Sequence, residues 1–344
     1  MTAISILDLV RVTQETDARG ALDNSRNLAA HAEQWGYQRF WVAEHHNMAG
    51  IASAATALVV SHIAAGTKTI RVGAGGIMLP NHAPIVIAEQ FGTLARLYPG
   101  RIDLGLGRAP GTDQLTMRAL RRSLQSSDNF PQDVLELQAY FAPAGPNQRI
   151  QAVPAAGTDV PLWILGSSTY GAQLAAALGL PYAFASHFAP EQLLQALQIY
   201  RSHFEPSEQS TKPHAMVGVN IIAADTDKEA KRLATTQQMS FVNMFRGTRG
   251  LSQPPIDDIE TYWSPAEKMQ AMGMLQRSIV GSQDTVRAGI AALVAETGAD
   301  ELMIVSDVYD HATRLTSFAL IAEAAGAGRP AAGDARPLAA VAGQ

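Results

Sequence analysis

Short apolar runs alternate with segments of helical periodicity along most of the chain, and this alternation limits the fold more than any other feature. The runs have the length and continuous hydrophobicity of strands that are buried on both faces, as in a parallel sheet. We expect eight such strands, at residues 4–7, 39–44, 70–74, 102–107, 162–165, 182–186, 215–222 and 301–306. Amphipathic helices are expected at residues 22–35, 53–65, 84–97, 170–178, 190–204, 228–245, 284–297 and 312–325. Eight strand–helix units predict a closed (β/α)8 TIM barrel, with an open doubly wound α/β sheet as the alternative.

Two stretches interrupt this alternation. Residues 113–160 contain an additional helical segment at 133–141, whereas residues 246–283 are rich in Gly and Pro and show no strand of their own. A loop of that length in a compact domain is usually a functional lid or a disordered segment. We therefore expect one domain over residues 1–326, a lid-like insertion at 246–283 near its C-terminal third, and a flexible Ala/Gly/Pro-rich tail at 327–344.

Composition excludes several classes of function. The net charge of −5 and the lack of a basic block argue against nucleic acid and anionic membranes as partners. The chain has no cysteine, which excludes disulfides, thiolate metal sites and cysteine nucleophiles. It shows neither a signal peptide nor an apolar run of the roughly 20 residues needed to span a bilayer. These features predict a cytoplasmic protein that acts on a small molecule.

The second expected strand runs directly into Glu44, His45 and His46. A general base, an acid partner and a metal ligand would then stand at the carboxyl-terminal end of the barrel, its mouth, where barrel enzymes hold their chemistry. Because strand side chains alternate, only one of the two histidines can face the mouth. A structural turn is the alternative. A metal site that also uses Asp8 and Asp307 is a weaker one, because adjacent histidines rarely bind one ion from a strand.

Glycines follow the third strand, at Gly73, Gly75 and Gly76. Glycine lets the backbone approach a flat ligand closely, and the alternative is a bulge or a tight turn. Their position at the mouth favours ligand approach.

Arg108 follows the fourth strand, and Ser167, Ser168 and Thr169 follow the fifth at the start of a helix. A guanidinium and a helix N-terminus rich in hydroxyls both favour phosphate. The alternatives are an ion pair with a carboxylate and ordinary helix caps. The glycine spacing fits neither a Rossmann nor a Walker loop. Taken together, these residues predict a cofactor that carries a phosphate.

Taken together, these segments make the chain resemble the bacterial luciferase-like monooxygenases over about residues 4–325. Within that family the chain looks most like the single-component branch of luciferase-like flavin-dependent oxidoreductases. The segments that carry the resemblance are Phe40-Trp41-Val42-Ala43-Glu44-His45-His46-Asn47, Gly75-Gly76-Ile77-Met78-Leu79-Pro80, Gly100-Arg101-Ile102-Asp103-Leu104-Gly105-Leu106-Gly107-Arg108 and Gly166-Ser167-Ser168. The resemblance implies a TIM barrel that uses reduced FMN or a related deazaflavin. It also implies a separate NAD(P)H:flavin reductase that supplies reduced flavin as a diffusible co-substrate, a homodimer, and no metal.

The resemblance also implies roles for individual residues. His45 matches the family's active-site histidine, and residues 246–283 match its mobile lid. Gly75 and Gly76 match a non-proline cis peptide that lies against the flavin ring. The flavin phosphate is matched by Arg108 together with the hydroxyl residues Ser167, Ser168 and Thr169.

One departure concerns the residue before the arginine, where light-emitting members carry a cysteine and this chain has Gly107. The loss of that thiol argues against light emission with long-chain aldehyde, and we expect the glycine to open space over the flavin ring. The first functional hypothesis is an FMN-dependent monooxygenase that acts on a small organic substrate. The alternatives are a dehydrogenase that uses the deazaflavin F420, a non-catalytic flavin-binding partner subunit, and a metal-dependent barrel hydrolase. His45 argues against the partner subunit, and the Gly75-Gly76 pair has no role in a hydrolase.

Overall fold

The computed structural model describes residues 2–109 and 113–327. Its strands are β1 (Ala3–Asp8), β2 (Arg39–Val42), β3 (Arg71–Met78), β4 (Ile102–Gly107), β5 (Leu162–Gly166), β6 (Tyr182–Phe184), β7 (Ala215–Ala223), β8 (Ile279–Gly281) and β9 (Glu301–Val305). Eight of them form a closed parallel barrel in the order β1–β2–β3–β4–β5–β6–β7–β9, with β9 paired back to β1. The expected TIM barrel is therefore confirmed, and the open sheet is excluded.

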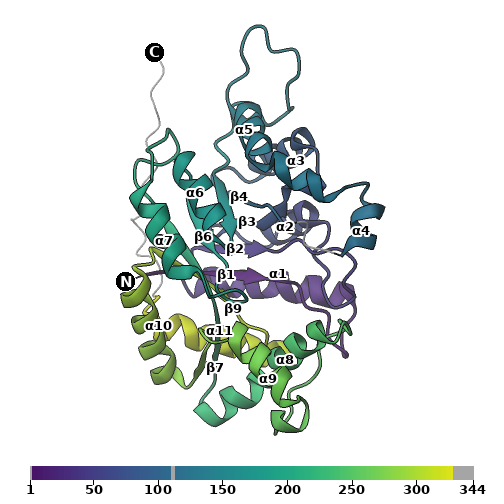
Figure 1. The fold of residues 1–344 in the computed structure, drawn as a ribbon, viewed down its shortest axis with the longest axis vertical. Coiled ribbons are helices and arrows are strands. Elements are labelled where there is room, and N and C mark those ends of the chain that lie inside the picture. The colour runs from purple at the N-terminus through teal and green to yellow at the C-terminus, as the bar shows by residue number, and fades with distance from the viewer. Residues whose placement is uncertain (1, 110–112, 328–344) are drawn as a thin grey trace.

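Helices cover the outside of the barrel (Figure 1). They are α1 (Ala18–Gln34), α2 (Thr56–Ala64), α3 (Pro84–Leu97), α4 (Gln114–Ala119), α5 (Phe130–Phe141), α6 (Thr169–Ala177), α7 (Leu193–Ser202), α8 (Asp227–Phe245), α9 (Pro265–Met274), α10 (Gln283–Thr297) and α11 (His311–Ala324), with short 3-10 turns η1 (Leu79–Asn81), η2 (Leu124–Asn129) and η3 (Ile259–Thr261). The eight helices expected between strands are all present. Gly298 ends α10 in the left-handed region at φ 59°, a conformation that glycine adopts without steric cost.

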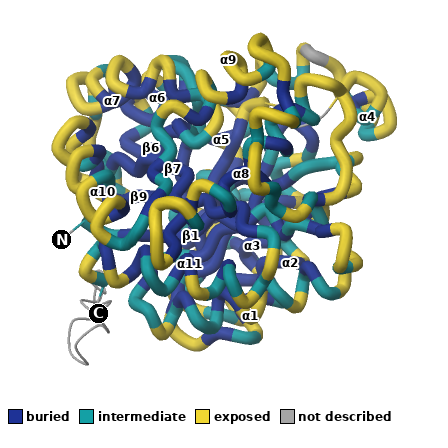
Figure 2. Tube along the Cα trace, turned by 90° about the horizontal axis from the view of Figure 1, so that it is seen from below, coloured by how far each residue is buried: buried dark blue, intermediate teal, exposed yellow. Residues whose placement is uncertain are grey.

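The strands are buried on both faces, as their continuous hydrophobicity predicts (Figure 2). The inner face carries a small cluster that includes Leu7, Trp41, Trp163 and Met216. The indole rings of Trp41 and Trp163 meet edge to face with their centroids 5.2 Å apart. The outer face packs against the helices in a much larger apolar cluster. Each large side chain that is fully buried contributes about 1.5–3 kcal/mol to stability.

Buried ion pairs close the amino-terminal end of the barrel. Arg39, at the start of β2, contacts Asp103 at 2.9 Å and Glu301 at 3.0 Å. Arg71, at the start of β3, binds the other oxygen of Asp103 at 2.6 Å. The carboxylates are buried yet ionised, because the arginine charges hold the pKa of Asp103 below its usual value against the opposing effect of burial. This end is therefore a structural plug, and the opposite end is the one available for function.

The insertion at 246–283 differs from its prediction. It contains η3, α9 and the short strand β8, so the expectation of no strand was wrong. β8 pairs with the end of β7 outside the closed barrel, and its three residues are too few to stand out as an apolar run. The first part of the insertion lies on a loop of the mouth, since the Ser252 amide donates to Val12 O at 2.9 Å and the Gln14 amide donates to Ser252 O at 3.1 Å.

The remaining expectations concern the chain ends. The tail predicted at 327–344 lies outside the described residues from 328 onward. Among the residues that are described, no helix is long and apolar enough to cross a membrane.

Candidate functional site

The site residues predicted from the sequence gather at the barrel mouth. His45 follows β2, the pair Gly75 and Gly76 lies within β3, Arg108 follows β4, and Ser167 begins the turn after β5. Because all strands of the barrel are parallel, their carboxyl ends meet at one face. The fold therefore brings these separate segments into one region.

Arg108 lies against the first turn of α6. Its guanidinium carbon sits 4.0 Å from the ring centroid of Tyr170, the second residue of that helix. Ser168 is the N-cap, and its hydroxyl makes no capping hydrogen bond, while the Thr169 amide donates to the Gln192 side chain at 3.2 Å. Within the described residues Arg108 forms no ion pair with a carboxylate, so the alternative structural role is not observed. A cation and a helix N-terminus thus stand side by side, which suits an anion.

The Gly75–Gly76 peptide bond is cis, as the resemblance implied. Neither position has room for a side chain. A Cβ on Gly75 would lie 2.8 Å from Leu7 and 2.9 Å from Trp41, and one on Gly76 would lie 2.6 Å from a backbone oxygen of β4. The nearest atom to a Cβ added at Gly107 would be the Met78 sulfur at 3.1 Å, so a larger residue there would require Met78 to shift slightly.

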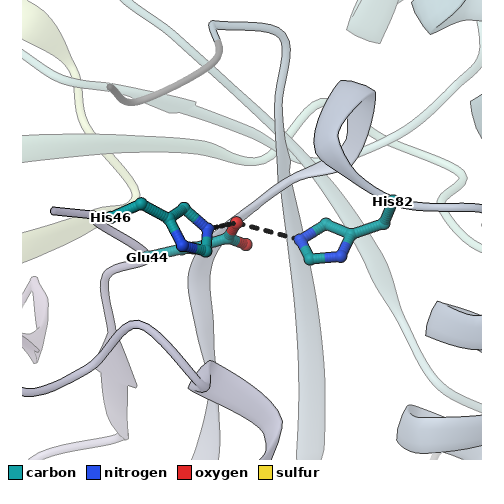
Figure 3. A group of neighbouring side chains, drawn as sticks. All are labelled: Glu44, His46 and His82. Carbon is teal, nitrogen blue, oxygen red and sulfur yellow. Dashed lines mark hydrogen bonds and ion pairs between the residues drawn. The ribbon is translucent and has the colours of Figure 1, made fainter. Parts of the chain in front are cut away.

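Glu44 joins two imidazoles to the end of β3 (Figure 3). One carboxylate oxygen bonds Nε2 of His46 at 2.7 Å and Nε2 of His82 at 2.9 Å, and the other accepts from the Met78 amide at 3.0 Å. Burial alone would raise the pKa of Glu44, but these bonds lower it to about 2. The bond to Glu44 in turn raises the pKa of His46. Glu44 is therefore an ionised anchor that fixes one wall of the mouth.

The same three side chains are the described residues best placed to hold a metal ion, since their ligand atoms lie within 4.8 Å of one another. The metal set considered from the sequence is not assembled. Asp8 is bound by Arg314 at 2.9 Å, and Asp307 is bound by both ends of the Arg11 guanidinium. His82 was missed because it follows a 3-10 turn rather than a strand, and only the fold brings it to Glu44.

His45 makes none of the hydrogen bonds of this anchor. Its Nδ1 atom is buried and has no hydrogen-bond partner among the residues that the structure describes. Burial, together with the positive charges of Arg11 and Arg249, lowers the pKa of His45 to about 4. The imidazole is therefore neutral at pH 7, with a ring nitrogen free to exchange a proton or a hydrogen bond with a ligand.

His187 was not predicted. It follows β6, and its Nδ1 atom is also buried without a partner in the described part of the chain. Burial lowers its pKa to about 4. Its position directly after an expected strand was the available signal, but a single histidine there did not stand out.

Comparison with known proteins identifies the family of the chain. Residues 2–301 match the family model described as luciferase-like monooxygenase. A luciferase-like monooxygenase of Escherichia coli K12 is 53% identical over 319 residues, which cover 92% of this chain and 95% of that protein. The crystal structure of apo-MsnO8 is 34% identical with a TM-score of 0.83, and the match covers 94% of this chain and 98% of that one.

A more distant structure shares the fold. The oxygenating constituent of 3,6-diketocamphane monooxygenase from Pseudomonas putida, in complex with FMN, has a TM-score of 0.68 at 19% identity and covers 95% of this chain and 99% of its own. From the family model and the close relative, the chain belongs to the luciferase-like monooxygenase family.

Proposed function

We propose that the protein is a monooxygenase that uses reduced FMN and molecular oxygen to oxidise a small organic substrate, with the flavin supplied by a separate NAD(P)H:flavin reductase. Family membership supports the class of reaction. The observation that carries the choice of a phosphorylated flavin is the position of the Arg108 guanidinium over the first turn of α6. Reduced flavin, when bound, activates oxygen for insertion into the substrate.

The phosphate would be held by Arg108 together with the hydroxyls of the turn after β5. Ser168 caps α6 without using its hydroxyl for the cap, which leaves that group available to a ligand. Ser167 and Thr169 flank it in the same turn. A charge-assisted hydrogen bond from arginine contributes about 1.5–3 kcal/mol, and a helix N-terminus adds about 0.3–1 kcal/mol.

The flat ring system of the flavin would lie along the backbone of Gly75 and Gly76. These residues lie in β3 between β2 and β4, and neither position has room for a side chain. The diketocamphane enzyme, which has the same fold, was solved in complex with FMN. Its complex shows that this fold can hold FMN, and we extend that property to this chain as part of the proposal.

His45 would serve as the acid/base group toward the substrate. Its imidazole is neutral and half-buried, and its Nδ1 has no competing partner among the described residues. Such a group can donate a proton to a substrate oxygen that gains negative charge during the reaction and take it back later.

We further propose that residues 246–283 act as the lid that excludes water. The first part of this insertion already lies on the loops after β1 and β2, because Gly250 packs against Gly50 and Ser252 bonds Val12. Exclusion of water protects reactive intermediates from side reactions.

The reaction class can be tested with a flavin reductase, FMN and NADH under an atmosphere of ¹⁸O₂. The protein is incubated with a panel of small organic compounds, and the products are analysed by mass spectrometry. We expect one labelled oxygen atom in a product from the wild type and none from His45→Ala. If no compound is labelled while the protein consumes reduced deazaflavin with an alcohol or carbonyl substrate, the dehydrogenase alternative replaces our proposal.

A further inference from the structure

The residues proposed to hold the flavin follow β3, β4 and β5, which is one side of the mouth. The remaining strand ends carry a second set of polar side chains. Arg11 and Asp307 stand in the loops after β1 and β9, and His45 and His187 follow β2 and β6. The proposed function leaves this half of the mouth for the substrate.

We propose that His45 and His187 bind one oxygen acceptor of the substrate, a carbonyl or carboxylate oxygen, from two sides of the mouth. This inference rests on the proposed function, since it assigns the substrate end of the same site. β2 and β6 are four places apart in the ring of eight strands, so they stand on opposite sides of the barrel. The interior of a barrel of this size is just wide enough for side chains to fill, so groups reaching inward from opposite strands come close to one another.

Both histidines have a ring nitrogen without a hydrogen-bond partner. The Nδ1 atoms of both rings are buried, and neither has a hydrogen-bond partner among residues 2–109 and 113–327. A buried ring nitrogen without a partner costs free energy, and in native proteins such an atom commonly marks a place for a ligand or ordered water. A single acceptor oxygen between two neutral imidazoles that donate from Nδ1–H would satisfy both.

His187 is held in place as a preorganised binding group would be. Its ring lies over Gly218 of β7, where a Cβ would come 2.6 Å from Nδ1. Its carbonyl oxygen accepts from the Asn220 side chain at 2.6 Å, and Asn220 in turn accepts from Gln237 at 2.8 Å. Asn220 and Gln237 are both buried. Gly218 and the edge of Phe188, 4.9 Å away between centroids, thus flank the ring, while the buried amide pair holds the backbone that carries it.

The charges around the pair favour an electron-rich group. Arg11 and Arg249 act on His45 from the mouth, and Arg11 is neutralised by its two bonds to Asp307 at 2.7 and 3.1 Å. Arg249, in the insertion at 246–283, forms no ion pair with any described residue. Arg249 therefore adds a positive charge near His45 that no described carboxylate pairs, which suits an oxygen acceptor and opposes an ammonium group.

The test uses the full-length protein labelled with ¹⁵N in its histidine rings. Straight-chain carboxylates from butanoate to octanoate, and the amides of the same lengths, are titrated in separate arms while the ring signals are followed by NMR. Signals are assigned with His45→Ala and His187→Ala. The exposed His203, at the end of α7, is the matched control through His203→Ala.

We expect at least one of these probes to shift the His45 and His187 signals along the same binding curve and to leave the His203 signal unchanged. His187→Ala should weaken that probe about tenfold, the effect of one lost hydrogen bond, while His203→Ala leaves it unchanged. Stronger binding of the carboxylate arm would identify an acid as the substrate, and stronger binding of the amide arm a neutral carbonyl compound. The proposal is overturned if no probe shifts both rings together or if His187→Ala binds the probe as well as the wild type.

A separate titration with FMN keeps the two proposals apart. His187→Ala should bind FMN as the wild type does, because His187 follows β6, whereas the residues proposed to hold FMN belong to β3 and to the turns after β4 and β5. Loss of FMN binding in the variant would contradict a role at the substrate end. Failure of the wild type to bind FMN would refute the proposed function. The NMR titration of His45 and His187 would still test the histidine pair, because it does not depend on FMN.

Discussion

Replacing Glu44 by glutamine tests the anchor at the mouth most sharply. The buried carboxylate accepts bonds from His46, His82 and the Met78 amide, and its low pKa shows that it is ionised. Glu44→Gln keeps the size of the side chain but removes the charge and one acceptor. Its single amide oxygen can accept either from the Met78 amide or on the side of the two imidazoles, so at least one of the three bonds to the carboxylate is lost.

The magnitude follows from these bonds. An unsatisfied buried donor costs about 1–3 kcal/mol, and hydrogen bonds to a charged group contribute about 1.5–3 kcal/mol each. Removal of one partner from a buried charged set typically costs about 3–5 kcal/mol in total. We therefore expect the free energy of unfolding of Glu44→Gln to fall by about 3–5 kcal/mol, a large fraction of the stability of most domains.

Urea denaturation at pH 7, followed by tryptophan fluorescence, measures this change. The exposed Glu191, before α7, supplies the control, and Glu191→Gln should lie within about 0.5 kcal/mol of the wild type. A loss below about 1 kcal/mol in Glu44→Gln, with an unchanged denaturant slope, would show that Glu44 does not anchor the mouth as described.

Three further predictions concern function and pH. His45→Ala should abolish turnover with FMN affinity unchanged, and a variant that keeps more than a tenth of the wild-type rate would contradict the acid/base role. Arg108→Ala should weaken FMN about 10- to 100-fold, from the loss of one charge-assisted bond, and leave riboflavin affinity unchanged in fluorescence titrations. Folding lowers the pKa of His45 and of His187 from 6.5 to about 4. Their contribution to stability is therefore complete above pH 6.5 and is lost as the pH falls toward 4. The free energy of unfolding should fall by up to about 2.7 kcal/mol per pH unit for the pair, and a flat profile between pH 7 and 5 would contradict their burial as neutral rings.

The barrel could be predicted because its strands are read from local hydrophobicity. β3 was expected to end at residue 74 but continues to Met78, since the glycines Gly75 and Gly76 lower the apolar signal without ending the strand. β8 was missed because three residues paired outside the barrel need no apolar run. Strand identity is thus written in the sequence, whereas strand ends and outer pairings depend on tertiary contacts.

The candidate site could likewise be predicted only in part from the sequence. Arg108 and the turn before α6 could be paired from the sequence because each follows a parallel strand, and the contact with Tyr170 places them together. His82 and His187 could not be assigned, because their partners, Glu44 and Gly218, are distant in sequence and meet them only in the folded barrel. The unpaired Nδ1 atoms of His45 and His187 are visible only once burial is known.

The central claim, that the mouth binds reduced FMN through its phosphate, is tested most directly by one anaerobic titration. Reduced FMN, reduced riboflavin and reduced deazaflavin F420 are each added to the wild type and to Arg108→Ala, and binding is measured by calorimetry. We predict that FMN binds the wild type at least tenfold more tightly than riboflavin and that Arg108→Ala removes the difference. Equal affinity for FMN and riboflavin in the wild type, or tighter binding of the deazaflavin than of FMN, would contradict the account.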